Sequence, residues 1–373
     1  MEFTVSKHDL SQALYKAQGV VDRKTNQTIL SHVLFESVGS SAVRFKCTDY
    51  DVVLTGTHAA EVAVPGRLAV GAKSMFEVVR TLPDLPIHVV GLENHWVELQ
   101  CGASRFRLAG LPPDDFPDQA SPENLSSFTI AKRLLVGMIE RTLFSVSHDE
   151  TRPSLNGVFF RVVREESEVR LTMVSTDGHR LSKCEVLGGD AGSFGPAAEA
   201  IVHHKALAEL KRTLEGEDEN TQIAFHRGNV YFSNDDVTLQ ARQVDESFPD
   251  YTKVIPRSAA ARLTLSRQAF QASIRRIATL TSAKTNIIKF EISPGRLVLS
   301  AQNPEMGEGR DELLVENESA ELSVGFNYKY LLEVLGVITG ESIWLSISDQ
   351  YSPGLITSPD DEGSLFVVMP MRI

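Results

Sequence analysis

The apolar and polar positions of this chain repeat three times in one register. Each repeat opens with a short alternating run, which predicts a β-strand, and continues with apolar residues spaced as on one face of a helix. The repeats begin at Phe3, Phe128 and Leu263. Such agreement is hard to obtain by chance, so the chain is interpreted as a triplication whose function depends on what three copies build.

A second helical pattern occurs later in each repeat, marked by Lys and Glu four residues apart with apolar residues after them. The three pairs are Lys73 with Glu77, Lys205 with Glu209 and Lys329 with Glu333. Together the two patterns predict six helices, over 6–18, 72–82, 131–143, 203–214, 266–280 and 328–337. Ser6 and Ser266 are good N-caps for two of these helices, whereas Ala131 is a poor one.

Alternating runs between and after the helices predict antiparallel strands, over 43–48, 52–57, 158–163, 170–174, 230–233, 237–242, 288–292 and 297–301. The predicted fold class is therefore α+β, with three repeated domains that each pack two helices on one face of antiparallel sheet. The expected domains are 1–125, 126–256 and 257–373. Polar or Ala-rich segments over 118–127 and 250–262 join them.

Charge is divided unevenly between the predicted helices and the rest of the chain. The net charge of −12 over 373 residues would by itself argue against a nucleic-acid partner. The six helices, however, hold fourteen Lys or Arg and five Asp or Glu, a balance of +9 that leaves −21 elsewhere. Helices tolerate Glu as well as Lys or Arg, so the shortage of Glu indicates that the helices face an anion.

Basic residues recur at equivalent helix positions. Lys16, Arg141 and Arg276 are expected on the polar face, whereas Lys7, Lys132 and Arg267 stand in the first turn. A cation there opposes the helix dipole and costs about 0.3–1 kcal/mol, so an external anion is the expected reason for it.

Known catalytic signatures are missing from the sequence, including a phosphate-binding loop and a His-Glu-x-x-His motif. The three cysteines lack paired spacing, which disfavours both a disulfide framework and a zinc site. No signal-peptide core or membrane span is apparent. The sequence therefore predicts a cytoplasmic protein that needs no metal or cofactor.

Two groups of residues leave an enzymatic alternative open. His179 beside Asp177 could act as a general base, but Asp177-Gly178 is also typical of a tight turn between strands. His203 and His204 could bind a metal, although adjacent histidines without a third ligand are more often ordinary surface residues. A hydrolase or metal enzyme built on these residues is the rival hypothesis, and its turnover would be sensitive to chelators.

Three motifs resemble the bacterial DNA polymerase III β subunit family of sliding clamps. They are Thr-Asp-Gly-His-Arg-Leu over 176–181, Ser-Phe-Pro-Asp-Tyr over 247–251 and Val-Val-Met-Pro-Met-Arg-Ile over 367–373. The triplication matches the three-domain layout of that family, so the resemblance covers the whole chain. It implies a head-to-tail homodimer that forms a ring around double-stranded DNA, with helices lining the hole and sheets outside. On that implication, the residues expected to face DNA are Lys7, Lys16, Arg23, Lys24, Lys73, Lys132, Arg141, Arg152, Lys205, Arg267 and Arg276.

The resemblance implies a non-enzymatic processivity factor. Its implied partners are the DNA polymerase III catalytic subunit, an ATP-driven clamp loader, and other polymerases and repair proteins that bind through short peptide motifs. A pocket between the second and third domains would take those peptides. Carried over residue by residue, it uses Leu155, Thr176, Gly178, His179, Arg180, Leu181, Pro249, Val254, Tyr330, Val367, Met369, Pro370, Met371 and Arg372.

The resemblance also implies a dimer edge. There Arg105, Phe106, Arg107 and Leu108 would meet Ile277, Leu280 and the acidic stretch 305–312 of the other subunit. Lys253, Thr285 and Pro153-Ser154 depart from the commoner family pattern, which leaves peptide preference and DNA contact strength open. A second rival hypothesis is a DNA-binding repeat protein that never closes into a ring.

Overall fold

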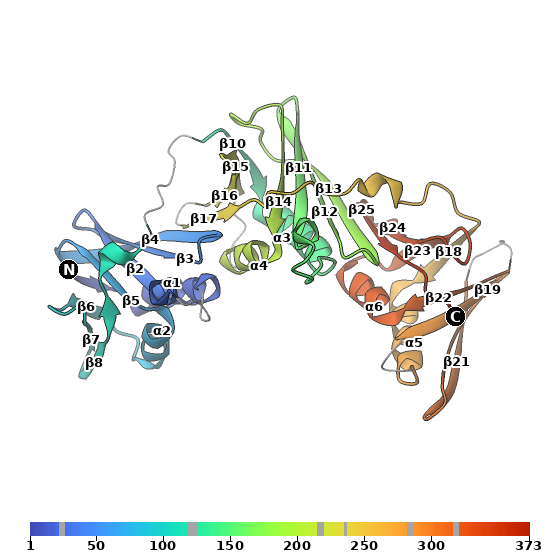
Figure 1. Cartoon of the computed structure of the whole chain (residues 1–373), viewed down its shortest axis with the longest axis horizontal. Helices are drawn as coiled ribbons and strands as arrows, with labels where there is room; N and C mark the ends of the chain where they lie inside the picture. Colours follow the sequence, from blue (N-terminus) through green and yellow to red (C-terminus); the bar gives the residue numbers. More distant parts are fainter. Residues whose placement is uncertain (22–26, 118–124, 215–219, 235–236, 282–285, 316–320) are drawn as a thin grey trace.

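The computed structural model describes residues 1–21, 27–117, 125–214, 220–234, 237–281, 286–315 and 321–373. These residues form an arch, with sheets on its convex side and helices on its concave side (Figure 1). The N-terminus lies in one end of the arch and the C-terminus in the other. Within the described residues, no helix is long and apolar enough to cross a membrane.

The arch consists of three units that repeat one order of elements. The first unit contains β1 (Glu2–Val5), α1 (Lys7–Val20), β2 (His32–Val38), β3 (Ala42–Thr48), β4 (Val52–Val64), β5 (Arg67–Gly71), α2 (Ala72–Thr81), β6 (Ile87–Gly91), β7 (Val97–Cys101), β8 (Ser104–Leu108) and the short β9 (Gly110–Leu111). The second unit contains β10 (Ser127–Ala131), α3 (Lys132–Leu143), β11 (Gly157–Glu165), β12 (Glu168–Thr176), β13 (Arg180–Gly188), β14 (Ala197–His203), α4 (His204–Thr213), β15 (Asn220–His226), β16 (Asn229–Ser233) and β17 (Val237–Arg242).

The third unit follows the same order. It contains β18 (Ala261–Ser266), α5 (Arg267–Ala278), β19 (Ile287–Ser293), β20 (Arg296–Asn303), β21 (Gly307–Leu314), β22 (Leu322–Asn327), α6 (Tyr328–Val337), β23 (Ser342–Ile347), β24 (Gly354–Ser358) and β25 (Asp361–Val368). All six predicted helices are confirmed to within two residues at each end, and all eight predicted strands lie inside observed ones.

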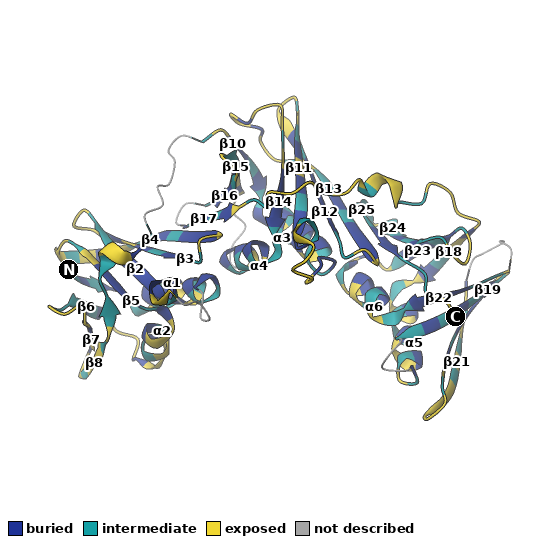
Figure 2. Cartoon of the chain, viewed as in Figure 1, coloured by how far each residue is buried: buried dark blue, intermediate teal, exposed yellow. Residues whose placement is uncertain are grey.

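The repeated apolar positions form the core, which explains why the sequence keeps them. Leu14, Ile139 and Ile274 occupy equivalent places in α1, α3 and α5, and each side chain is fully buried. Figure 2 shows this buried layer between the helices and the sheets. The predicted caps are also confirmed, because the Ser6 hydroxyl accepts the Asp9 N–H at 3.0 Å, whereas Ala131 supplies no side-chain cap.

Sheets continue across the boundaries between units. In the first boundary β4 pairs antiparallel with β17, and Leu54 lies opposite Leu239. In the second boundary β13 pairs antiparallel with β25, and Leu181 lies opposite Val367. Among the described strands, β8 and β21 each end a sheet. Strands β9, β10, β14, β18 and β22 also end sheets, but β8 and β21 lie at the two ends of the arch (Figure 1), and we call these two strands the free edges.

Candidate functional site

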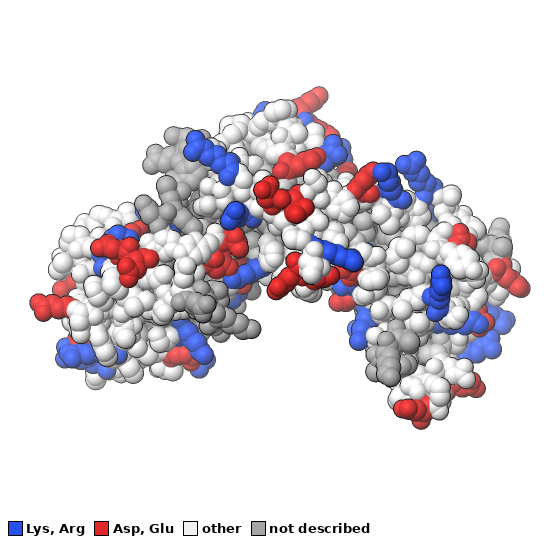
Figure 3. Space-filling model, in the orientation of Figure 1, with Lys and Arg blue, Asp and Glu red and all other residues white. Residues whose placement is uncertain are grey.

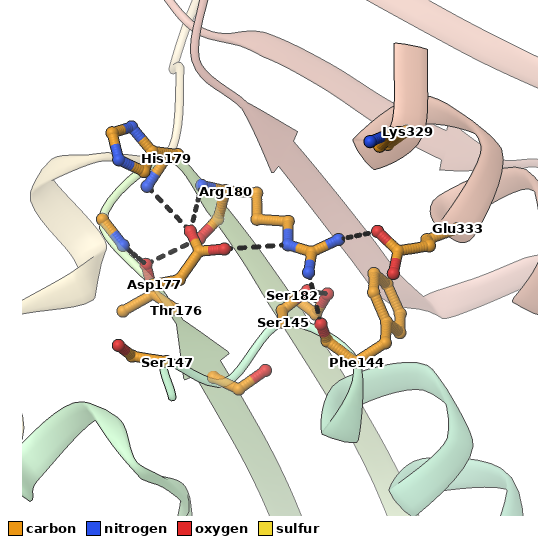
Figure 4. A network of polar contacts seen from close by, with 12 residues as sticks. Phe144, Ser145, Ser147, Thr176, Asp177, His179, Arg180, Ser182, Lys329 and Glu333 are labelled. Atoms are coloured by element: carbon orange, nitrogen blue, oxygen red, sulfur yellow. Dashed lines mark hydrogen bonds and ion pairs between the residues drawn. The ribbon is translucent and has the colours of Figure 1, made fainter. Parts of the chain in front are cut away.

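The turn between β12 and β13 is held by its own side chains. The Asp177 carboxylate accepts the backbone N–H groups of His179 at 2.8 Å and Arg180 at 3.0 Å (Figure 4). Thr176 donates its hydroxyl to the Arg180 carbonyl at 2.6 Å, and Gly178 has a φ of +90°, which favours glycine. Asp177 thus binds the backbone of His179, and its carboxylate does not orient the imidazole as a general-base pair requires.

Arg180 is a buried strut between the second and third units. Its side chain is 9% exposed, and its guanidinium donates to Asp177 at 3.0 Å and to the Phe144 carbonyl at 2.5 Å. It also pairs with Glu333 on α6 (Figure 4), and it lies 4.5 Å from the centroid of the Tyr330 ring. The guanidinium of Arg180, which is among the expected pocket residues, is therefore occupied within the chain, because a buried guanidinium needs partners for its donors.

Replacing Arg180 with alanine is expected to lower the free energy of unfolding by about 3 kcal/mol, since it removes one partner of a buried charge network. Asp177 and Glu333 would then keep charges without their shared cation. Urea unfolding measures the loss, and limited proteolysis reports release of the third unit. The matched control is Arg372→Ala, at an exposed arginine. Equal free energies of unfolding for both variants would contradict a stabilising role of Arg180 between the second and third units.

An apolar surface lies beside this turn. Leu181 and Val367 are buried at its base, and Tyr251 and Phe248 pack against them from the segment before the third unit. The Met369 N–H donates to the His179 carbonyl at 2.8 Å, which fixes the C-terminal segment next to the turn. Other expected pocket residues are accessible there or partly so, namely His179, Leu155, Pro249, Val254, Tyr330, Met369 and Pro370.

From this surface the last residues run along the third unit. The Met371 N–H donates to the Gly325 carbonyl at 2.8 Å, so the tail extends the sheet at β22. Arg372 lines a separate cleft of about 800 Å³, together with Lys289 and Arg310. The structure therefore brings the 176–181 turn together with Tyr330, Val367 and Met369, and it directs Arg372 to another cleft.

The first-turn cations of the helices make internal contacts. Lys7 donates to the Leu82 carbonyl at the end of α2, and Arg267 donates to the Leu335 carbonyl at 3.2 Å near the end of α6. Lys132, at the equivalent position of α3, is 7% exposed. The expectation that only an external anion explains these residues is therefore wrong. The carbonyl end of the neighbouring helix attracts a cation.

Acids on strands or in the loops between them pair with several other helix cations. Arg141 lies 2.9 Å from Asp361, and Arg276 lies 2.5 Å from Asp311. Lys205 pairs with Asp49, and Lys16 is partly buried. Lys73 and Arg152 are exposed, whereas Arg23 and Lys24, like Thr285, lie outside the described residues. Figure 3 shows acidic groups interspersed with basic ones over the face in view.

Sequence reasoning passed over two better-exposed cations. Arg133 on α3 and Arg275 on α5 are exposed, and neither forms an ion pair with any other part of the described chain. Both contribute to the positive charge of the predicted helices. The repeat register does not select them, because the equivalent positions in the other units carry different residue types. Exposure could be recognised only once the helices had been packed.

The histidines assigned as ordinary surface residues contribute to local structure. The His203 Nδ1 atom accepts the Lys205 N–H at 3.2 Å and so caps α4. His204 Nδ1 lies 2.9 Å from the Asn156 carbonyl. Across the residues described, no cluster of three His, Cys, Asp or Glu side chains is arranged to hold a metal ion.

The free edge of the first unit carries a charge cluster. Arg105 and Arg107 on β8 donate to Glu98 on β7, at 2.5 Å and 2.8 Å. Phe106 between them is 38% exposed. At the other free edge, Leu280 approaches β21, where a Cβ added to Gly309 would lie 2.9 Å from its Cδ1. Ile277, expected at the dimer edge, is 4% exposed and belongs to the core of the third unit.

Hydrogen bonds from Arg105 and Arg107 hold the pKa of Glu98 below its ordinary value. The stabilisation from ionised Glu98 is therefore present above the pKa of an unfolded-chain glutamate and is lost as pH falls through the lowered folded-state pKa. We expect the stability difference between the wild type and Glu98→Gln to shrink from pH 6 to pH 3. A difference that does not change with pH in a urea titration would contradict this pairing.

Comparison with known proteins agrees with this geometry. Family models of the DNA polymerase III beta subunit match in sequence order, with the N-terminal domain over 1–120, the central domain over 129–250 and the C-terminal domain over 252–372. A beta sliding clamp from Caulobacter vibrioides is 34% identical, and one from Escherichia coli K12 is 30% identical, each over 100% of both chains.

Solved structures agree over the same length. The DNA polymerase III subunit beta from Pseudomonas aeruginosa superposes with a TM-score of 0.92 at 34% identity, covering 100% of both chains. The DnaN sliding clamp from Bartonella birtlesii, solved with griselimycin bound, gives 0.93 at 31% identity with the same coverage. On sequence, fold and length together, this chain belongs to the DNA polymerase III beta subunit family of sliding clamps.

Proposed function

We propose that two copies of this chain close head to tail into a ring around duplex DNA and tether the polymerase to its template. The pairing of strands at the unit boundaries carries this proposal. β4 and β13 are equivalent strands, and each pairs with the last strand of the next unit, β17 or β25. In the third unit the strand equivalent to β4 and β13 is β21. In the first unit the strand equivalent to β17 and β25 is β8. If β21 of one copy pairs with β8 of the other, the same junction repeats and the ring closes.

Helix contacts support the same junction. Lys205 on α4 donates to the Val20 carbonyl at the end of α1 at 3.2 Å, which joins the first two units. Lys73 is its equivalent on α2 and is exposed in the single chain. In the ring, Lys73 would meet the carbonyl end of α5 in the other copy. We therefore assign Lys73 to the dimer junction in preference to the DNA channel.

The concave face would hold DNA without reading its sequence. Phosphate contacts carry no base information and weaken with salt, which suits a ring that moves along the duplex. Ion pairs between helix cations and strand acids keep this attraction moderate, and Arg133 and Arg275 supply charges that are not paired in this way. The closed ring would stay on the DNA because it encircles the duplex. By holding the polymerase, it would raise the local concentration of polymerase at the primer end.

Reversing the charge of Arg133 and Arg275 to Glu is expected to flatten the salt dependence of DNA binding. Each lost phosphate contact reduces the slope of log K against log salt by about 0.9. Titration of a fluorescent duplex over a range of salt concentrations measures it. Arg161→Glu with Arg242→Glu is the control pair, since both exposed arginines lie on strands. Equal slopes for the two double variants would contradict the channel assignment.

The apolar surface beside the 176–181 turn would be the client pocket. Its buried base of Leu181 and Val367 spans the second and third units, and Met369 adds an adaptable side chain suited to several partners. The polymerase catalytic subunit, the clamp loader, and other polymerases and repair proteins would bind there through short peptide motifs. Opening and loading would be done by an ATP-driven loader.

The proposed domains are 1–125, 126–256 and 257–373, and each holds one complete set of the repeated elements. Beta sliding clamps are non-catalytic subunits, and the proposed place of action is the cytoplasm. Primer extension on a long primed circle, with loader and polymerase, tests the function. The expected result is much longer products per binding event when the chain is present. Unchanged product length would contradict the proposal.

A further inference from the structure

A depression of about 630 Å³ lies between the helices of the second and third units. Its apolar lining includes Leu143, Phe144 and Val146, at and after the end of α3, and Val337 at the end of α6. His204 and Lys211 on α4 stand at its polar side. We name this depression the helix-layer pocket. It shares no residue with the proposed client pocket.

The helix-layer pocket offers flat apolar surfaces next to hydrogen-bonding groups. The ring of Phe144 is held in place, because the Arg180 guanidinium lies 5.2 Å from its centroid and the Phe366 ring packs at 6.2 Å. The rings of His148 and His204 meet edge to face at 4.9 Å. Such a lining fits a planar heterocycle, which can stack on one surface and present its edge to another.

Two polar groups could bind the edge and the charge of that ligand. His204 Nδ1 lies 2.9 Å from a carbonyl oxygen, so this nitrogen carries the proton and Nε2 remains an acceptor in the neutral ring. Lys211 pairs with Glu140 at 2.7 Å, and both side chains are nearly half exposed. An approaching phosphate could compete with Glu140 for the ammonium group, while Glu140 could accept from an amino group of the heterocycle.

The helices that form the pocket lie on the concave side, where the proposed ring holds DNA (Figure 1). Bases inside a duplex are stacked and offer no free face, whereas an unpaired base does. We propose that the helix-layer pocket takes an unpaired nucleobase of single-stranded DNA, with the adjacent phosphate near Lys211. This inference rests on the proposed ring only for the source of the ligand.

Methyl NMR on the full-length protein tests the proposal directly. The probe is a thymidine octanucleotide, with the same strand in a duplex as the comparison. Saturable shifts of the Leu143, Val146 and Val337 methyl groups are expected with the single strand and not with the duplex. Equal shifts with both forms would overturn the proposal, as would shifts confined to Leu181, Met369 and Met371 in the client pocket.

A filling variant adds an independent measurement. A Cβ at Gly336, which lines the pocket, would meet no atom within 4 Å, so the side chain of Gly336→Leu starts in open space and adds bulk to the pocket. This substitution should lower the affinity for the octanucleotide at least tenfold. Gly195→Leu is the matched control, at an exposed glycine of the second unit with equal free space. Unchanged affinity of a folded Gly336→Leu would overturn the proposal. If that variant unfolds, the methyl shifts of the wild-type protein alone test the proposal. Retention of the protein on circular DNA tests the proposed ring separately.

Discussion

Replacing Met369 and Met371 with alanine is expected to weaken binding of a client peptide about 30- to 150-fold. Truncating two flexible apolar side chains at a peptide surface should cost about 2 to 3 kcal/mol together. Both methionines are partly exposed, and Met369 is fixed beside the turn by its hydrogen bond to His179. The buried base of Leu181 and Val367 stays intact, so the fold and the dimer should persist.

Fluorescence anisotropy with a labelled peptide from the catalytic subunit of the polymerase measures this loss. The control is Leu187→Ala, since Leu187 is 48% exposed at the far end of β13. If Leu187→Ala binds the peptide with wild-type affinity, the loss of affinity in the double-methionine variant is specific to the pocket. Unchanged peptide affinity of the double-methionine variant would show that clients bind elsewhere.

The second large effect is expected at the free edge of the first unit. Phe106→Glu should convert the dimer into monomers of 41.1 kDa, because it places an acid among residues that would face the acidic stretch before and within β21. Phe106 lies opposite the apolar Leu99 of β7, and an acid that meets an acidic partner strand disfavours pairing at a strand edge. Analytical ultracentrifugation distinguishes the monomer from a particle of twice its mass.

Val64→Glu is the matched control for the dimer edge. Val64 is 47% exposed in the same unit, at the end of β4, so the substitution adds the same charge elsewhere. Peptide binding by the Phe106→Glu monomer should be normal, because the client pocket lies within one chain. A Phe106→Glu variant that remains dimeric would rule out β8 as the contact edge.

The repeated pattern predicts the fold well because it records burial. Leu10, Leu135 and Phe270 recur at one position, and each packs under the sheets of its own unit. Helix positions follow from that periodicity, and the caps follow from Ser6 and Ser266. Motifs at 176–181 and 367–373 also lead to the proposed client pocket, and the structure brings the two motifs together because β13 and β25 pair.

Contacts between residues far apart in the chain could not be predicted from the sequence pattern. Arg180 pairs with Glu333, which lies 153 residues away, so no local pattern indicates that it is buried. Lys7 and Arg267 contact the second helix of their own units, and helix periodicity gives no sign of that packing. From the sequence, a cation in the first turn of a helix therefore indicated an external anion. In the structure, the same cation is bound by carbonyl groups at the end of the second helix.

The central claim is that two chains close into a ring around DNA. It is tested by loading the protein with loader and ATP onto nicked circular DNA, washing in high salt, and measuring the bound protein before and after the circle is cut. The ring predicts that protein stays on the circle and is lost once the DNA has ends. If salt removes it equally from circular and linear DNA after successful loading, the three units bind DNA without encircling it.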